Sequence, residues 1–196
     1  MKKTELKLQR HFKLFKPYGY LSQFASNARH QANSKFLGDL FDFPPHSMAV
    51  GRLDKDSEGL LLVTTDGQLS HHINSNSIEK EYWVQVDGNI PEKAIETLKS
   101  GIQISGEGKI YGTKACKVYR LHDEPILPNR TKPIRTDRHG ATSWISITIT
   151  EGKFRQVRKM TAAVGYPTLR LVRIRIGTHH LDSMQPKEVV ELESLL

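Results

Sequence analysis

The chain has 196 residues, enough for one domain of ordinary size or two tightly joined lobes around a buried core. Its 29 lysines and arginines outnumber 21 aspartates and glutamates, and the resulting formal charge of +8 favours a polyanionic partner. The single cysteine, Cys116, excludes an internal disulfide, and no Cys/His cluster has zinc spacing. No stretch resembles a membrane span or a signal sequence. We therefore expect a reduced, cytoplasmic protein without a metal.

Hydrophobic periodicity and turn residues divide the first half of the chain into a basic tail, two strands and a short helix. Weak alternation marks the first strand, and a turn containing proline and glycine ends it. The second strand is a continuous apolar run, which suits burial on both faces better than a hairpin edge. In chain order we predict a tail at 1–9, a strand at 11–15, a short helix capped by Ser34 and stopped by Pro44 and Pro45, and a strand at 60–63 closed by Asp66 and Gly67.

The second half of the chain predicts alternating strands and helices. Three of its segments alternate apolar and polar residues, and the last of these strands has one apolar and one mostly basic face. The predicted elements are a strand at 82–87, a helix from Pro91 to Gly101, a long loop at 122–140, a strand at 144–150, a helix from Arg155 and a strand at 171–176. Intermixed strands and helices of this kind indicate an α/β (α+β) fold around a mixed sheet.

A charged loop, Gly51–Gly59, immediately precedes the most apolar strand. It contains three carboxylates, Asp54, Asp56 and Glu58, together with two basic residues. Glycines at both ends permit close approach of the backbone to a ligand, and the strand that follows is a rigid platform for a site. A solvated turn with local ion pairs is the structural alternative.

A second candidate segment, 151–165, combines an amphipathic helix with a run of basic residues. At about 100° per residue, the helix buries one face and offers basic side chains from the other. Its apolar face carries Val157, Met160 and Val164, and its basic face carries Arg155, Arg158 and Lys159. The segment is therefore either a polyanion-binding helix or a surface helix with a basic outer face.

Four segments, in this order along the chain, resemble the motifs of the pseudouridine synthases that modify ribosomal RNA. The sequence GRLDKDSEGLLLVTTDG is similar to the family signature, in which the aspartate of GRLD is catalytic. FKPYGYLSQF resembles the family's KPxG strand and turn, and KEYWVQVDG its tyrosine-bearing strand. EGKFRQVRKMTAAVGYPTLRLVRIRIG resembles its basic helix and following strand. The four ordered matches, from residue 11 to residue 177, argue against coincidence.

The resemblance implies an isomerase that detaches a uracil from its ribose and rejoins it through C5, without a cofactor or a metal. It implies 23S ribosomal RNA or a large-subunit assembly intermediate as the partner, and we expect a cytoplasmic monomer. Residues 10–196 would form the catalytic domain, a mixed and largely antiparallel central sheet flanked by helices, in two lobes with a central RNA-binding cleft. Because only about ten residues precede the first strand, we expect no N-terminal S4 RNA-binding domain.

Four residues receive specific roles from the resemblance. Asp54 matches the catalytic aspartate, which begins the reaction either by attacking C1′ or by removing a ribose proton. Arg158 matches the arginine that pairs with this aspartate, where two hydrogen bonds could orient the carboxylate and keep it charged. Tyr82 matches the aromatic residue that stacks on the uracil. Arg52 matches the position that fills the space of the flipped base, or else contacts a phosphate.

The remaining charged residues receive structural or RNA-binding roles. We expect Asp56 and Glu58 to make local hydrogen bonds within the loop, and Lys16 and Pro17 to shape the pocket wall. Phosphate contacts would make RNA affinity fall steeply with salt. The predicted phosphate contacts are Lys153, Arg155, Lys159, Arg170, Arg173, Arg175, Arg130, Lys132 and Arg135.

Two other functions are compatible with parts of the sequence. A non-catalytic assembly factor that binds ribosomal RNA would account for the basic surface but leaves the Asp54 motif unexplained. A glycosidase acting on small sugars could use Asp54 with Asp56 or Glu58 as its carboxylate pair. The basic composition and the scarcity of aromatic residues argue against a glycosidase.

Overall fold

One mixed sheet of nine strands organises the part of the chain that the computed structural model describes, residues 9–75, 78–106, 108–134 and 140–196. The predicted basic tail at 1–9 lies almost wholly outside these residues. The main path of the sheet runs β11-β1-β3-β9-β4-β8-β7, and only the pair β3 and β9 is parallel. Its strands are β1 His11–Lys16, β3 Glu58–Thr64, β4 Lys80–Asp87, β7 Lys117–Leu121, β8 Thr142–Ile149, β9 Thr168–Ile176 and β11 Val189–Leu192.

Shorter elements complete the architecture. Strands β2 and β10 pair with β3 and β9, and β5 and β6 form a separate hairpin. No helix among the described residues is long and apolar enough to cross a membrane. The remaining elements are η1 Arg29–Gln31, η2 Leu37–Asp39, β2 Met48–Val50, α1 Gly67–Asn74, α2 Glu92–Ser100, β5 Gln103–Gly106, β6 Lys109–Gly112, α3 Gln156–Ala163 and β10 His179–His180.

Strand β3 is buried along its whole length, as its continuous apolar run predicts. It is paired on both sides, with β1 and with β9. Leu60 and Leu62 belong to one hydrophobic cluster, whereas Leu61 and Val63 belong to another. Successive residues of a strand point to opposite faces, so both faces of β3 are covered by apolar side chains.

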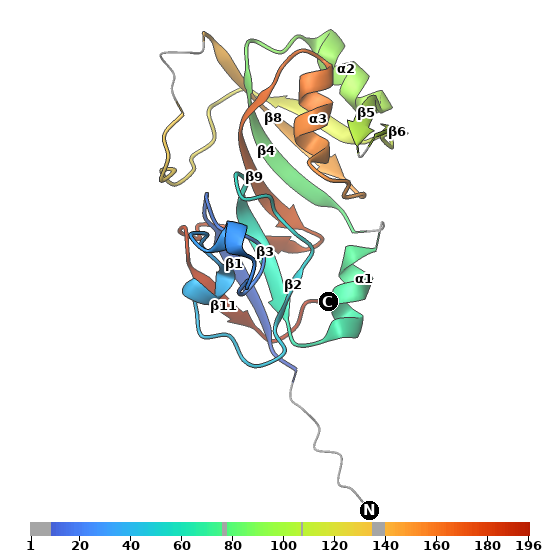
Figure 1. The fold of residues 1–196 in the computed structure, drawn as a ribbon. Coiled ribbons are helices and arrows are strands. Elements are labelled where there is room, and N and C mark those ends of the chain that lie inside the picture. The colour runs from blue at the N-terminus through green and yellow to red at the C-terminus, as the bar shows by residue number, and fades with distance from the viewer. Residues whose placement is uncertain (1–8, 76–77, 107, 135–139) are drawn as a thin grey trace, which may run out of the picture.

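The sheet divides into two halves that meet where β3 pairs with β9 (Figure 1). One half contains β1, β2, β3 and β11 with α1, and the other contains β4, β7 and β8 with α2 and α3. Helices α2 and α3 pack on the second half around a core that includes Ile95, Leu98 and Met160. The mixed, largely antiparallel sheet flanked by helices confirms the predicted fold class.

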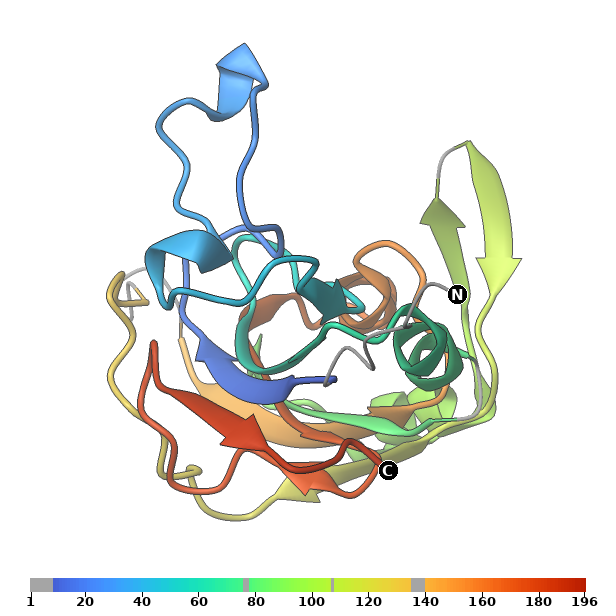
Figure 2. The same ribbon diagram turned by 90° about the horizontal axis from the view of Figure 1, so that it is seen from below.

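Two projections extend from one face of the molecule (Figure 2). One is the segment that carries η1, and the other is the β5–β6 hairpin. They lie on either side of α3. This face is therefore bordered by two arms that come from opposite halves of the sheet.

The predictions of local structure are only partly correct. Ser34 caps no helix, because the following segment forms only the single 3-10 turn η2. Asp66 follows the end of β3 as predicted, and its carboxylate also accepts hydrogen bonds from Gln68 N and Leu69 N and so caps α1, a helix that was not predicted. The long predicted loop contains no strand or helix within 122–134, and its residues 135–139 lie outside the described part. Strands β5, β6, β7 and β11 were not predicted, because they are short and carry little alternation.

The junction between β3 and β9 requires a glycine. Gly59 has a φ of 105°, which L side chains rarely adopt. A Cβ atom at this position would lie 2.3 Å from the carbonyl oxygen of Arg173, well inside van der Waals contact. The two halves of the sheet can therefore approach this closely only because residue 59 has no side chain.

We expect Gly59→Ala to lower the free energy of unfolding by more than about 3 kcal/mol, since the new methyl group must displace the β9 backbone. Gly108→Ala is the matched control, because Gly108 also has a positive φ, 77°, but no heavy atom lies near its Cβ position. The control should lose only about 1–2 kcal/mol from backbone strain. Chemical denaturation measures both values, and equal losses would show that the close approach to β9 is unimportant.

Candidate active site

A cleft of about 750 Å³ opens beside the charged loop that carries Asp54. Its walls come from the loop 51–57, from β4 and from the segment 152–157 before and within α3. Asp54, Tyr82 and Arg52 all line it. The structure therefore brings together three of the four residues that received specific roles from the sequence, although they lie on separate parts of the chain.

The turn after β1 braces the loop that carries Asp54. Ser22 Oγ donates a hydrogen bond to Leu53 O at 2.7 Å and accepts one from Leu53 N at 2.9 Å. Gly19 N donates to Lys55 O at 2.7 Å. Within the loop, Ser57 N donates to Asp54 O at 3.0 Å. Asp54 is thus fixed by backbone bonds on both sides, and Ser22 is a site residue that our sequence reasoning missed, although it lies in the segment FKPYGYLSQF.

Among the described residues, the cation that forms an ion pair with Asp54 is Arg155, which the sequence assigned to phosphate binding. Its Nη1 lies 3.6 Å from Asp54 Oδ2. The Asp54 side chain is about a quarter exposed, so the carboxylate is accessible from the cleft. In this structure Arg155 therefore occupies the place beside Asp54 that was predicted for another arginine.

Arg158 does not pair directly with Asp54, and the predicted two-bond pair between them is wrong for this structure. Its Nη2 donates to Asp56 O at 2.8 Å and lies 3.3 Å from Ser57 Oγ. The turn after Asp54 brings Asp56 O and Ser57 Oγ toward α3, where both oxygens contact the Arg158 guanidinium. With its side chain only 11% exposed, Arg158 fastens the loop to the helix.

Asp56 binds residues far away in sequence rather than within its own loop, which corrects the local role predicted for it. Its carboxylate accepts two hydrogen bonds from Arg155, at 2.9 and 2.8 Å, and its Oδ2 lies 3.6 Å from Arg158 Nη2. Burial raises the pKa of Asp56. The hydrogen bonds from Arg155 and the charges of both arginines lower it, and together they outweigh burial, so the pKa lies below its usual value. Asp56 is the residue that joins the loop to both arginines.

Arg155 adopts an unusual backbone conformation at the start of α3. Its φ is 53°, in the left-handed region that non-glycine residues seldom occupy. Such strain persists where surrounding contacts impose it, and it concentrates at functional sites. The two bonds to Asp56 are the contacts that hold the Arg155 side chain here.

Glu58 and two predicted phosphate contacts form a buried cluster instead. Arg170 donates two hydrogen bonds of 3.1 Å to the Glu58 carboxylate, and Arg130 Nε lies 3.7 Å from Glu58 Oε2. The Arg130 guanidinium also lies 3.8 Å above the centre of the Tyr18 ring. This cluster ties the long loop to the start of β3, so Arg130 and Arg170 are structural rather than free for phosphates.

Arg175 and Arg173 are also not surface phosphate contacts. Arg175 donates to Glu79 at 3.0 Å and to Glu81 at 2.9 Å, and these ion pairs occupy its guanidinium. Arg173 is only 2% exposed. On the predicted basic face of β9, Arg175 is therefore neutralised by ion pairs, and Arg173 is enclosed.

Among the described residues, four of the predicted RNA contacts are neither enclosed nor held in an ion pair. Arg52 and Lys153 are exposed and line the cleft. Lys132 is exposed, and Lys159 is half-buried with its Nζ 5.1 Å from the centre of the Phe154 ring. Arg135 lies outside the described residues. The basic surface is thus smaller than the composition suggested.

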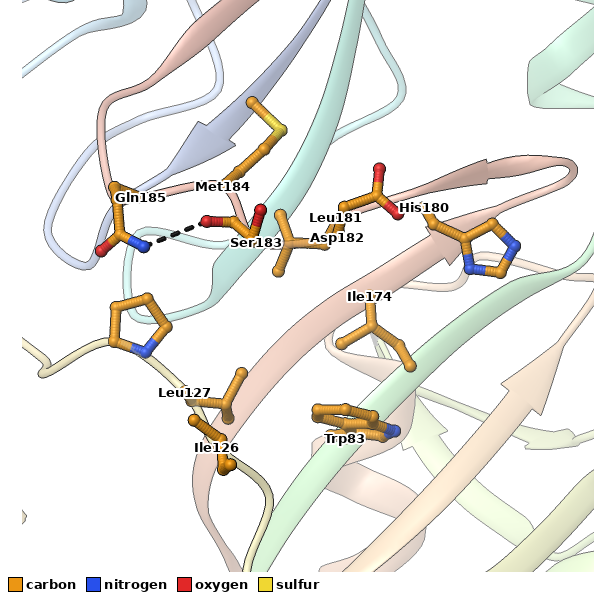
Figure 3. A pocket seen from close by; sticks show the side chains of 11 residues that line it. Trp83, Ile126, Leu127, Ile174, His180, Leu181, Asp182, Ser183, Met184 and Gln185 are labelled. Atoms are coloured by element: carbon orange, nitrogen blue, oxygen red, sulfur yellow. Dashed lines mark hydrogen bonds between the residues drawn. The ribbon is translucent and has the colours of Figure 1, made fainter.

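A second pocket, of about 500 Å³, lies between β4, β9 and the segments 126–128 and 180–185 (Figure 3). Trp83 and Ile174 line this pocket, whereas the preceding residue on each strand, Tyr82 or Arg173, lines the cleft. Successive side chains of a strand point to opposite faces, so the two pockets lie on opposite sides of the sheet. Asp182 at the edge of the second pocket is paired with Lys13 at 2.7 Å. Its walls are otherwise largely apolar, and it lacks the convergent charges of the cleft. No group of three or more potential metal ligands occurs among the described residues.

Lys16 is fully buried beside the charged loop. Its Nζ donates to the carbonyl oxygens of Pro17 at 3.1 Å and Tyr20 at 2.7 Å, and these bonds close the turn that braces the site. Burial lowers the pKa of Lys16 to about 7, and the charges of Glu58, Asp56 and Asp54 only partly oppose this effect.

This shift predicts a pH dependence of stability. Between pH 7 and 10.5 the unfolded chain keeps the Lys16 proton that the folded protein releases, so stability rises with pH. The contribution approaches about 1.4 kcal/mol per pH unit. Lys16→Met should remove this rise from the unfolding free energy, while the exposed Lys93→Met should retain it. Identical pH slopes for wild type and Lys16→Met would contradict the assignment.

Comparison with known proteins identifies the family. The profile of the family described as RNA pseudouridylate synthase matches residues 11–163. Ribosomal large subunit pseudouridine synthase E of Xanthomonas campestris pv. campestris is 44% identical over 88% of this chain and 90% of the relative. The protein of that name in Vibrio parahaemolyticus is 38% identical over 91% of this chain and 71% of the relative.

A solved structure agrees with the sequence comparisons. The crystal structure of a pseudouridylate synthase matches with a TM-score of 0.75 and 29% sequence identity, over 96% of this chain and 72% of that one. The matched range, residues 11–163, spans Asp54, Tyr82 and Arg158, and the cleft unites the first two with the loop that Arg158 holds. The chain therefore belongs to the RNA pseudouridylate synthase family.

Proposed function

We propose that this protein converts a specific uridine of large-subunit (23S) ribosomal RNA into pseudouridine. The observation that carries the proposal is the cleft in which Asp54 and Tyr82 lie together beside Arg155. The relatives that are 38–44% identical over most of the chain bear the name ribosomal large subunit pseudouridine synthase E, which supports this class of RNA.

The target nucleotide must leave the RNA stack before the chemistry can begin. Flipping costs a few kcal/mol, and stacking of the base on an aromatic ring returns roughly 1–3 kcal/mol. Tyr82 is mostly buried but lines the cleft, so its ring forms part of the wall against which the uracil would lie. Exposed Arg52, two residues before Asp54, is placed to fill the vacated stack or to bind a phosphate.

Asp54 then acts on the ribose. Attack on C1′ and removal of a ribose proton both require an ionised carboxylate held close to the sugar. Arg155 lies beside this carboxylate, and the bonds that Ser22 and Ser57 make with the loop backbone fix its position. Arg158 contributes indirectly, since it holds the backbone of Asp56.

The RNA would reach this cleft between the two projections of Figure 2. The cations on or near this path, Arg52, Lys153 and Lys159, would bind phosphates and make affinity fall with salt. We further propose that the enzyme acts as a monomer, without a metal or cofactor, and in the cytoplasm, where a ribosomal RNA substrate of this kind would be found.

The alternative functions fit the geometry less well. A glycosidase needs a second carboxylate free to act as acid or base. Asp56 is bound by Arg155, and Glu58 is 2% exposed and bound by Arg170, so neither is free to do so. A non-catalytic RNA-binding factor has no need for an accessible carboxylate whose loop is braced from both sides.

Asp54→Asn tests the proposed reaction. Release of tritium from 23S ribosomal RNA labelled at uridine C5 reports isomerisation, because among the candidate functions only that reaction removes the C5 hydrogen. We expect the substitution to reduce the rate by at least about a thousandfold, since a neutral amide neither attacks C1′ nor accepts a proton. Asp182→Asn, the same change at the second pocket, should release tritium at the wild-type rate. Wild-type protein that releases none would refute the proposal.

Asp56→Asn tests the charge network around Asp54. Loss of the two-bond pair should let Arg155 and the loop move, and displacements near 1 Å can cost about a hundredfold in rate. We expect kcat to fall roughly ten- to a hundredfold with little change in RNA affinity. Glu191→Gln is the matched control, because it breaks a similar two-bond pair with Arg10 on the surface. Unchanged kcat in Asp56→Asn would remove the network from catalysis.

A further inference from the structure

Arg173 is a cation buried in the wall of the cleft, and no described acidic residue forms an ion pair with it. Its side chain lines the cleft on β9, and the residue is 2% exposed. Its Nε donates to Leu60 O at 2.8 Å. Its Nη2 is buried and has no hydrogen-bond partner in the described part of the chain. Among the ion pairs between described residues, none involves Arg173 either.

Such an arrangement is unfavourable unless something compensates for it. Burial of a charged group that is not paired is strongly unfavourable, and an apolar side chain of similar volume would avoid this cost. Burial, and then the charge of Arg173, lower the pKa of Lys80, which also lines the cleft. The inner end of the cleft is therefore electropositive and suited to an anionic group that enters it.

The position of Arg173 identifies which part of the RNA it would meet. Arg173 and Tyr82 are direct partners across β9 and β4, and the guanidinium carbon lies 6.0 Å from the centre of the Tyr82 ring. A uracil stacked on Tyr82 would bring its polar edge beside this guanidinium. The sugar and phosphate of the same nucleotide would stay nearer the opening, where the exposed Arg52 and Lys153 lie.

The proposed isomerisation creates an anion beside Arg173, namely the detached uracil. When the C1′–N1 bond breaks, the bonding electron pair stays with the base, whether Asp54 attacks C1′ or removes a ribose proton. The uracil then carries a negative charge delocalised over N1, O2 and O4. The base turns, and C5 donates an electron pair to C1′ to form the new bond. In the attack route this step breaks the Asp54–C1′ ester bond and frees the carboxylate, and in the elimination route C2′ takes its proton back from Asp54. The C5 proton is then lost to solvent, and its bonding pair restores the uracil ring.

We propose that Arg173 Nη2 donates a hydrogen bond to a uracil carbonyl oxygen, O2 or O4, and stabilises the detached uracil anion. The inference rests on the proposed function, because it assigns a further catalytic residue to the same reaction. A preorganised donor of this kind acts on charge that develops in the transition state, so it raises kcat more than it tightens binding.

The test compares Arg173→Met with wild-type protein in the tritium-release assay. Removal of one such donor costs about 10²–10³ in kcat, and we expect a loss of this size with RNA affinity within a few-fold of wild type. Arg173→Lys keeps the charge but not the position of Nη2 and should recover only part of the rate. Arg120→Met is the matched control, because Arg120 also donates to a backbone carbonyl, that of Ile90, but lies outside the cleft.

A second measurement uses the substrate instead of the protein. RNA with 2-thiouridine or 4-thiouridine at the target replaces one carbonyl oxygen by sulfur, a weaker acceptor that makes the base a better leaving group. Wild-type protein should convert one of the two thio-RNAs more slowly than uridine RNA. Arg173→Met should convert that thio-RNA and uridine RNA at similar rates, because the donor that distinguishes oxygen from sulfur is gone. The inference fails if folded Arg173→Met turns over within about threefold of wild type, or if wild type converts both thio-RNAs as fast as uridine RNA. Wild type that is inactive on every RNA would instead refute the proposed function.

Discussion

The active site depends on one ion-paired residue, Asp56, which joins two separate parts of the chain. Its carboxylate binds Arg155 through two hydrogen bonds, and its backbone carbonyl accepts a third bond from Arg158. These contacts hold the loop that carries Asp54 against α3, about a hundred residues later in the sequence. Because the two-bond pair is only partly exposed and has a specific geometry, it favours one position of the loop. Asp54 thereby acquires a neighbouring positive charge without being bonded so tightly that it could not reach a substrate.

The sheet places the rest of the site around this junction. Strands β3 and β9 meet in parallel at Gly59, and the close approach puts Arg173 of β9 next to the start of β3. Strand β4, on the other side of β9, carries Tyr82 opposite Arg173. The aromatic wall and the buried guanidinium therefore come from two neighbouring strands of the sheet, and the carboxylate comes from the loop just before β3. This arrangement gives a pocket whose outer part suits the ribose and whose inner part suits a base that becomes anionic.

The sequence predicted the parts of this structure that have strong local signals. The run Leu60–Val63 and the alternation at 82–87 specify strands, and the motif around Asp54 specifies the family. The partners of the charged residues could not be predicted in the same way, because they depend on contacts between residues far apart in sequence. Arg155 and Arg158 lie three residues apart on one basic face, so only the folded geometry decides which of them stands beside Asp54. Likewise, nothing local distinguishes Arg173, which is buried, from exposed Lys153.

The central claim is that the carboxylate held in this cleft isomerises a uridine of large-subunit ribosomal RNA. Pseudouridine mapping of all ribosomal RNA from cells that lack this protein tests it most directly, with wild-type and Asp54→Asn genes returned to those cells. The account predicts that one site in 23S RNA is lost, that the wild-type gene restores it and that the variant does not. Persistence of every pseudouridine in 23S RNA, or loss of a site in transfer RNA instead, would contradict it.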